Sequence, residues 1–290
     1  MPSPVRIIPR LDIKGPNLVK GVNLEGLRVL GKPDRFARHY YESGADELLY
    51  MDVVASLYGR NSLLDAVERT AREIFIPLTV GGGLRSLDDI RQALRAGADK
   101  IALNTAAVRN PGLINEAARE FGSSTIVLSI EAKRQPGGSY QAFIDHGREP
   151  AGLDALAWAV QAAERGAGEI LITSIDREGV GLGFDLTLTR QVADAVPIPV
   201  IASGGGGQLD HIRAVILEGH ANAVCLASML HYGHARRSSG DEDYSQEGNT
   251  EYLRAGAGVQ KRIASISIPE MKGWLVEQGI ACRLEEPASA

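Results

Sequence analysis

The stretch Ile76-Pro-Leu-Thr-Val-Gly-Gly-Gly-Leu-Arg-Ser-Leu-Asp-Asp-Ile-Arg-Gln-Ala-Leu-Arg-Ala-Gly-Ala-Asp-Lys-Ile-Ala-Leu-Asn-Thr105 decides the fold. It has the pattern of a buried strand, a glycine turn, an amphipathic helix and a second strand. A related stretch, Ile198-Pro-Val-Ile-Ala-Ser-Gly-Gly-Gly-Gly-Gln-Leu-Asp-His-Ile-Arg213, follows 122 residues later (198 − 76). Small residues after a buried strand leave backbone N–H groups free to bind a phosphate at a helix N-terminus. One glycine turn is weak evidence, since glycine is also used wherever φ is positive. Two matching turns predict a ligand with a phosphate at each end.

The repeat extends beyond the glycine turns, because Gly44-Ala-Asp-Glu-Leu-Leu recurs as Gly166-Ala-Gly-Glu-Ile-Leu at the same shift. Eight apolar runs have the mostly non-alternating pattern of strands buried on both faces. They are Arg6–Asp12, Leu48–Val53, Ile76–Val80, Lys100–Leu103, Thr125–Ala132, Glu169–Ser174, Val200–Ala202 and Ala223–Ala227. Helical patterns alternate with them near Asp34–Ser43, Ser62–Glu73, Leu87–Ala96, Pro111–Phe121, Gly152–Arg165, Asp185–Ala195, Leu209–Leu217 and Ile268–Glu277. This alternation predicts an α/β fold, a (β/α)8 TIM barrel built from two (βα)4 half-barrel repeats.

Length and composition fit a single barrel that spans residues 1–290. The chain is 44% hydrophobic and 23% charged, as is ordinary for a globular enzyme. Its net charge of −5 gives no indication of nucleic-acid or anionic-membrane binding. Cys225 and Cys282 lie far apart and lack partners at metal-ligand spacing, which favours a reducing, cytoplasmic setting and argues against a zinc site. We expect neither a signal peptide nor a membrane span.

Two long loops interrupt the alternation. Gly15–Gly31 follows the first strand and contains Lys20. The polar segment Gly233–Ala264 separates the eighth strand from its helix, and we interpret it as a disordered surface insertion in preference to a lid.

Two acidic residues end the first and fifth strands, where a barrel places its active site. Asp12 and Glu131 occupy matching places in the two halves, so we expect them to face each other across the barrel mouth. Paired carboxyl groups suit general acid–base catalysis. Asp52 and Asp176 follow the second and sixth strands; Asp52 is expected near the site, whereas Asp176 could equally cap a loop.

Another repeated pair closes the fourth and eighth strands. Asn104-Thr105 and Ala227-Ser228 would each add hydrogen-bond donors beside a glycine turn. Ser203 replaces the first glycine of the second turn and could donate its hydroxyl group.

Four charged residues lie at the opposite, amino ends of the strands: Arg6, Glu47, Lys100 and Glu169. Their charges sum to zero, and buried charges must be paired. They therefore predict a salt-bridged floor to the barrel, or alternatively a gate. The six histidines show no nucleophile or metal pattern, and His231 is interpreted as structural.

Several motifs occur in a specific order. They are Arg-Ile-Ile-Pro-x-Leu-Asp-Ile-Lys, Gly-Ala-Asp-Glu-Leu, Leu-Thr-Val-Gly-Gly-Gly-Leu-Arg, Ala-Gly-Ala-Asp-Lys, Asn-Thr-Ala-Ala-Val, Gly-Ala-Gly-Glu-Ile-Leu-x-Thr-Ser, Asp-Arg-Glu-Gly and Val-Ile-Ala-Ser-Gly-Gly. Together they resemble the cyclase subunits of imidazole glycerol phosphate synthase, from histidine biosynthesis. The resemblance implies a lyase without cofactor or metal, partnered by a glutaminase subunit. Ammonia from glutamine would pass through the barrel and react with a ribulosyl-linked bisphosphate, giving imidazole glycerol phosphate and aminoimidazole carboxamide ribotide.

The resemblance also implies roles for individual residues. Asp12 would be the first catalytic acid or base, with Glu131 as the second, and Lys20 the lysine of a mobile first loop. The two phosphate sites would comprise Gly83, Asn104 and Thr105 on one side, and Gly179, Ser203, Gly204, Gly205, Ala227 and Ser228 on the other. Arg6, Glu47, Lys100 and Glu169 would form the ammonia gate, with Asp99 at the glutaminase interface. Arg10, Asp52, Thr173 and Asp176 complete the candidate active-site residues.

Two departures concern the chemistry. The second catalytic position is usually aspartate but is Glu131 here, and the extra methylene moves the carboxylate by roughly 1 Å, enough to cost about 10²-fold in rate. Arg10 stands where the family usually has cysteine. We hypothesise that Arg10 and Glu131 changed together and interact directly or through the substrate. These departures, and the insertion, leave open a paralogue that aminates another phosphorylated or nucleotide-linked sugar, for instance in surface polysaccharide synthesis. The related sugar-phosphate isomerase and a non-catalytic glutaminase activator remain weaker alternatives.

Overall fold

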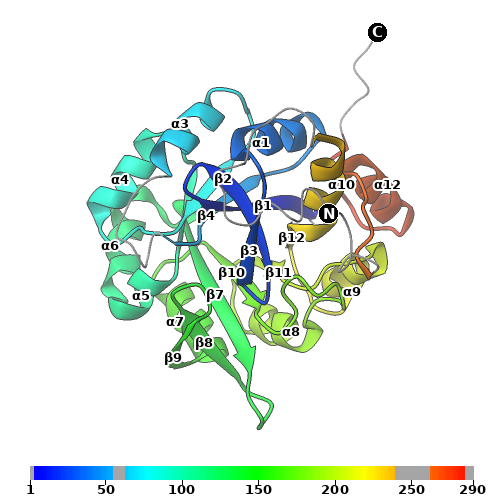
Figure 1. Ribbon diagram of the computed structural model, residues 1–290. Helices are drawn as coiled ribbons and strands as arrows, with labels where there is room; N and C mark the ends of the chain where they lie inside the picture. Colours follow the sequence, from blue (N-terminus) through cyan, green and yellow to red (C-terminus); the bar gives the residue numbers. More distant parts are fainter. Residues whose placement is uncertain (1–2, 55–62, 239–261, 285–290) are drawn as a thin grey trace.

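The predicted barrel is confirmed by the computed structural model, which describes residues 3–54, 63–238 and 262–284. Eight parallel strands form a closed sheet in the order β1-β4-β5-β6-β7-β10-β11-β12, with β12 pairing back onto β1. Figure 1 shows these strands at the centre of a ring of helices. The strands are β1 (Arg6–Lys14), β4 (Leu48–Asp52), β5 (Leu78–Gly81), β6 (Lys100–Leu103), β7 (Ile126–Arg134), β10 (Glu169–Ser174), β11 (Val200–Ser203) and β12 (Ala223–Leu226).

The helices between the strands agree with the predicted ranges to within a few residues. They are α1 (Pro33–Glu42), α3 (Leu64–Ala71), α4 (Leu87–Arg95), α6 (Gly112–Phe121), α7 (Ala155–Glu164), α8 (Leu186–Ala195), α9 (Leu209–Leu217) and α12 (Ile268–Glu277). Two further helices, α5 (Thr105–Arg109) and α10 (Ser228–Ser238), and the 3-10 turn η1 (Ser123–Thr125), were not predicted. The N-terminal ends of α5 and α10 place Thr105 and Ser228 at the carboxyl ends of β6 and β12, beside the site described below.

Each half-barrel has a β-hairpin after its first strand, which the sequence analysis missed. The loop predicted at Gly15–Gly31 is instead the hairpin β2 (Asn17–Val22) and β3 (Glu25–Gly31), and β8 (Tyr140–Ile144) and β9 (Glu149–Asp154) follow β7. Both hairpins turn through two successive residues of positive φ, Asn23 and Leu24 in the first, Asp145 and His146 in the second. The first turn lacks the glycine that such turns usually contain, which hides it in the sequence, whereas the second continues into Gly147, which also has positive φ.

Strand register confirms the internal repeat. Asp12 pairs with Met51 across β1 and β4, and Glu131 pairs with Thr173 across β7 and β10. Met51 and Thr173 are 122 residues apart (173 − 51), so the two carboxyl groups occupy equivalent positions on opposite walls of the barrel. The same register makes Arg10 equivalent to Ser129, since their partners Leu49 and Leu171 are also 122 residues apart.

The polar segment predicted at Gly233–Ala264 begins differently in the structure. Gly233–Ser238 belongs to helix α10, so the predicted start is wrong. Residues 239–261 lie outside the described residues, and the prediction of a surface insertion in preference to a lid is therefore not tested. Across the described ranges, no helix combines the length and the apolar character that a bilayer crossing requires.

Candidate active site

Two hollows lie at the carboxyl ends of the barrel strands, one over each half. The first has a volume of about 290 Å³ and is lined by Gly83, Asn104, Thr105, Asp52 and Glu131, among others. The second encloses only about 30 Å³ and is lined by Arg10, Lys20, Gly179, Ser203, Gly204, Gly205, Ala227 and Ser228. The residues expected at each phosphate therefore gather in two separate places.

The two glycine turns share one backbone geometry. Gly82 and Gly204 have φ values of 92° and 87°, a region that L-residues with a side chain rarely adopt. A Cβ atom at Gly82 would lie 2.2 Å from the carbonyl oxygen of Asp52, and one at Gly204 would lie 2.7 Å from that of Ser174. Both turns thus need glycine for its conformation and for the close approach of a neighbouring strand end.

Asp12 is held by Arg10, an arginine that lines the second hollow. Its carboxylate accepts a hydrogen bond from Arg10 Nε at 2.8 Å, and both side chains are buried. Burial raises the pKa of the Asp12 carboxyl group, but the positive charges of Arg10 and Lys20 outweigh that effect and hold the pKa below its ordinary value. Asp12 is therefore a carboxylate at neutral pH.

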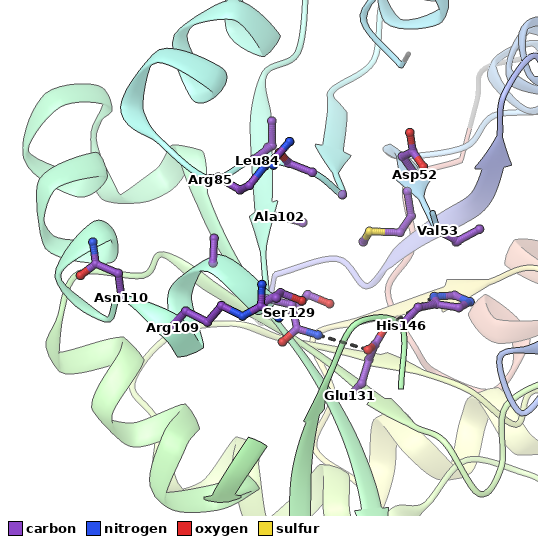
Figure 2. Close-up of a pocket in the computed structure, with 16 residues that line it drawn as sticks. Asp52, Val53, Leu84, Arg85, Ala102, Arg109, Asn110, Ser129, Glu131 and His146 are labelled. Carbon is purple, nitrogen blue, oxygen red and sulfur yellow. Dashed lines mark hydrogen bonds and ion pairs between the residues drawn. The ribbon is translucent and has the colours of Figure 1, made fainter. Parts of the chain in front are cut away.

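Glu131 lies at the wall of the first hollow in different surroundings (Figure 2). Its carboxyl group accepts a hydrogen bond from Asn104 Nδ2 at 3.1 Å and another from the backbone N–H of Gly147. Burial raises the pKa of Glu131 to about 7, although the charge of Arg10 and the Gly147 hydrogen bond both oppose the rise. Glu131 can therefore exchange a proton near neutral pH, as a general acid or base must.

The hairpin β2–β3 closes the second hollow. Lys20 Nζ forms a buried ion pair with Glu178, and Glu178 Oε2 accepts the backbone N–H of Leu24 at 2.9 Å. Burial lowers the pKa of Lys20, but the Glu178 carboxylate more than compensates, so the amine stays charged. The hairpin thus holds a cation over the second glycine turn.

A ring of four charges closes the other end of the barrel. Arg6 and Lys100 each bind both Glu47 and Glu169, at N···O distances between 2.9 and 3.3 Å. All four side chains lie at the amino ends of strands, as predicted. The arrangement is a salt-bridged floor, and the charges in it sum to zero.

Comparison with known proteins decides the family. A family model described as "Histidine biosynthesis protein" matches residues 6–236. The chain belongs to this family. It is 61% identical over 211 residues to the imidazole glycerol phosphate synthase subunit HisF of Legionella pneumophila, which covers 73% of this chain and 100% of that protein. It is also 53% identical over 233 residues to the HisF subunit of Thermosynechococcus vestitus, which covers 79% of this chain and 83% of that protein. These relatives make it an enzyme subunit of the HisF type and confirm the resemblance.

Arg10, the first departure from the HisF pattern, lies inside the barrel. Its guanidinium group donates to Asp12 and, at 3.4 Å, to the Thr173 hydroxyl, while Nη2 is buried without a hydrogen-bond partner among the described residues. Its direct partner is thus Asp12 rather than Glu131, and it acts on Glu131 only through its charge. The expected direct contact with Glu131 is therefore not found among the described contacts, and an interaction through the substrate stays a prediction.

The remaining candidates divide between the site and its surroundings. Asp52 is buried and lines the first hollow, where its carboxylate accepts the backbone N–H of Val54 at 3.0 Å. Asp176 is exposed and accepts the backbone N–H of Arg134 at 2.8 Å, so it caps a loop.

Asp99 lies at the opposite end of the barrel, where its carboxylate accepts the backbone N–H of Leu78. His231 is structural, bonded to the carbonyl oxygen of Arg10 and to the Tyr40 hydroxyl.

Sequence reasoning missed two residues of the site, His146 and Glu178. Both lie in turns, where the alternation of a strand no longer tells which way a side chain points. Glu178 falls two residues after Asp176 and faces the second hollow, while His146 lines the first. The described part of the chain holds no group of three or more side chains suited to bind a metal ion.

Proposed function

We propose that this chain is the cyclase subunit of an imidazole glycerol phosphate synthase. It would use ammonia to convert a ribulosyl-linked bisphosphate to imidazole glycerol phosphate and aminoimidazole carboxamide ribotide. The observation that carries the proposal is the pair of hollows, each beside a glycine turn and a helix N-terminus. Glu131 lines the first hollow, and Asp12 is bound to Arg10 in the wall of the second. A substrate with a phosphate at each end fits this arrangement, because each phosphate meets free backbone N–H groups.

The two carboxyl groups supply the proton transfers. Ammonia that adds to a carbonyl carbon must lose a proton, and the carbonyl oxygen must gain protons to leave as water. Asp12 is suited to accept a proton or to stabilise positive charge, since Arg10 keeps it ionised. Glu131 is suited to donate one, since its pKa lies close to 7.

Ammonia would enter through the charged floor. The ring of Arg6, Glu47, Lys100 and Glu169 would open for a small neutral molecule without leaving a net charge, as its four charges cancel. A glutaminase subunit would bind at this face, where Asp99 is exposed. The chain would form a single barrel domain.

A second candidate is a paralogous synthase that aminates another phosphorylated or nucleotide-linked sugar. The Arg10–Asp12 ion pair favours it, because a carboxylate bound by a buried guanidinium is a weaker base than a free one. Both candidates share the ammonia chemistry and differ in the substrate.

One assay separates them. The purified protein is given the bisphosphate and an excess of ammonium salt near neutral pH, where Glu131 is still partly protonated, and loss of substrate absorbance is followed. Turnover that disappears in Asp12→Asn supports the cyclase. A folded parent protein that gives no turnover would overturn it in favour of the paralogue.

A further inference from the structure

His146 occupies a constrained position that no role in the proposed chemistry yet explains. It lies at the turn of hairpin β8–β9, where its own φ of 58° and the φ of 50° at Asp145 direct its ring inward. The turn is anchored, because Thr105 Oγ1 accepts the backbone N–H of Asp145 at 3.0 Å and Arg109 binds the Asp145 carboxylate at 2.9 Å. The imidazole is consequently buried in the wall of the first hollow.

The ring has one nitrogen near Glu131 and one with no partner. Nδ1 lies 3.9 Å from Glu131 Oε1, which is about 1 Å beyond hydrogen-bond distance. Nε2 is buried and has no hydrogen-bond partner among the described residues. A buried polar atom left unpaired is unfavourable, so a ligand group in the first hollow would be stabilised by pairing with it.

Glu131 itself is already bound on its other side. Asn104 holds Oε2, and the N–H of Gly147 donates to the same carboxyl group. The imidazole therefore lies next to the one carboxylate oxygen that Asn104 does not hold. Figure 2 shows Glu131 and His146 as neighbours in the wall of the hollow.

The surroundings keep the imidazole neutral. Burial lowers the pKa of His146 to about 4; Asp12 and Glu178 oppose this shift, whereas Arg10 and Arg148 add to it. A neutral imidazole carries a proton on one nitrogen and a lone pair on the other. A proton gained at Nδ1 can thus be matched by one lost at Nε2, with no net charge left on the ring.

We propose that His146 is a third catalytic residue, which relays a proton between the Glu131 carboxyl group and a substrate atom in the first hollow. In the donating direction, Glu131 gives its proton to Nδ1 while Nε2–H gives its proton to the departing substrate oxygen. Glu131 becomes a carboxylate and the imidazole changes tautomer. In the accepting direction, a nitrogen that has just formed its bond to carbon gives a proton to Nε2, and Nδ1–H returns a proton to Glu131. The inference rests on the proposed function for the substrate but not for the Glu131–His146 pair itself.

A kinetic test compares His146→Gln, Glu131→Gln and the double variant in the ammonium-dependent assay. His146→Gln is expected to lower kcat by about 10²-fold with KM changed less than about threefold, and the double variant is expected to be little slower than Glu131→Gln, because residues that act as a unit are not additive. Glu149→Gln is the matched control: Glu149 lies on the same hairpin, is exposed, and the variant should keep the parent kcat. A His146→Gln variant that folds and retains kcat within about threefold would overturn the relay.

A second measurement does not depend on turnover. In the full-length parent protein, the 15N chemical shifts of the His146 ring should report a change of tautomer with a midpoint near pH 7, as Glu131 titrates, without forming imidazolium. The change should be absent in Glu131→Gln. A ring that keeps one tautomer across pH 6 to 8 overturns the relay even if the enzyme is active. An inactive parent with the expected tautomer change overturns the proposed substrate and supports the relay.

Discussion

Asp12 and Glu131 occupy equivalent strand positions in the two half-barrels, yet their carboxyl groups meet opposite surroundings. Asp12 is bound by the guanidinium of Arg10, and its pKa is lowered. At the position equivalent to Arg10, the Glu131 half has Ser129, and burial raises the pKa of Glu131 to about 7. The residue two positions earlier, Arg10 in one half and Ser129 in the other, thus contributes to the difference between the pKa values of the two carboxyl groups. The repeat sets the strand position of each carboxyl group, and the neighbouring residues set its pKa.

The hollows differ in the same way. The first has a volume of about 290 Å³ and the second of about 30 Å³, where hairpin β2–β3 brings Lys20 to Glu178. The matching hairpin β8–β9 places His146 beside Glu131 instead. The two halves share their glycine turns and strands, and they differ in the residues that the hairpins contribute.

The largest expected effect comes from removing either carboxylate. Asp12→Asn and Glu131→Gln are each expected to lower kcat by about 10²–10⁴-fold, the usual contribution of a general acid or base. The parent kcat should fall as pH rises through about 7, because the proton donor Glu131 is then lost. The residual activity of Glu131→Gln should lack this fall, and that of Asp12→Asn should keep it. Asp176→Asn serves as the control with unchanged rate, and identical pH profiles in the two variants would contradict the assignment of roles.

Arg10→Met tests the origin of the asymmetry. Removing one partner of a buried ion pair leaves Asp12 unpaired, and the free energy of unfolding at pH 7 should fall by about 3–5 kcal/mol. Without Arg10 the pKa of Asp12 rises, so the loss should shrink as pH falls and Asp12 becomes protonated. Chemical denaturation at several pH values measures the effect. The double variant Arg10→Met/Asp12→Asn should regain much of the stability, and a double variant no more stable than the single one would contradict the pairing.

Alanine at the two glycine turns compares the halves directly. Gly82→Ala and Gly204→Ala each place a residue at positive φ, at a cost of about 1–2 kcal/mol. Gly82→Ala should be the more destabilising, since its Cβ would lie closer to a carbonyl oxygen than that at Gly204. Gly122→Ala is the control, because its φ is 88° and no atom lies within 4 Å of its Cβ. Melting temperatures in the order Gly122→Ala highest and Gly82→Ala lowest are expected, and the reverse order would refute the steric account.

The smallest expected effect is the pH dependence of folding stability that Glu131 causes. Since the pKa of Glu131 is raised to about 7 from 4.5, the folded chain binds more protons than the unfolded chain between these values. The contribution of Glu131 to stability therefore falls as pH rises from about 4.5 to 7 and stays low above it. Glu131→Gln, which carries no such charge, should melt a few degrees above the parent protein at pH 8 and lose that advantage at pH 5. An equal difference at both pH values would show that Glu131 does not titrate in this range.

Much of this architecture could be predicted from the sequence because its signals are local. Runs of Ile, Val and Leu mark buried strands, and glycine turns 122 residues apart mark a duplicated half-barrel. Strand alternation also places Arg10 on the same face as Asp12, so their ion pair could have been predicted, although Glu131 was chosen as the partner. The contacts that distinguish the halves are not local. His146 approaches Glu131 from the turn of a hairpin that the sequence analysis missed, and Glu178 forms an ion pair with Lys20 from 158 residues away.

The burial of the cysteines has a practical consequence for spectroscopy. Burial raises the pKa of Cys225 to about 12, so this thiol does not readily form the thiolate that reacts with maleimide or methanethiosulfonate probes, whereas Cys282 is only half-buried. Cysteines introduced at Glu25, at the start of β3, and at Gly137, in the turn between β7 and β8, would be exposed and could carry a pair of spin labels once Cys282 is replaced by serine, with Cys225 retained. Distances between the labels, with and without phosphate ligands, would then report whether hairpin β2–β3 moves relative to the β7–β8 arm.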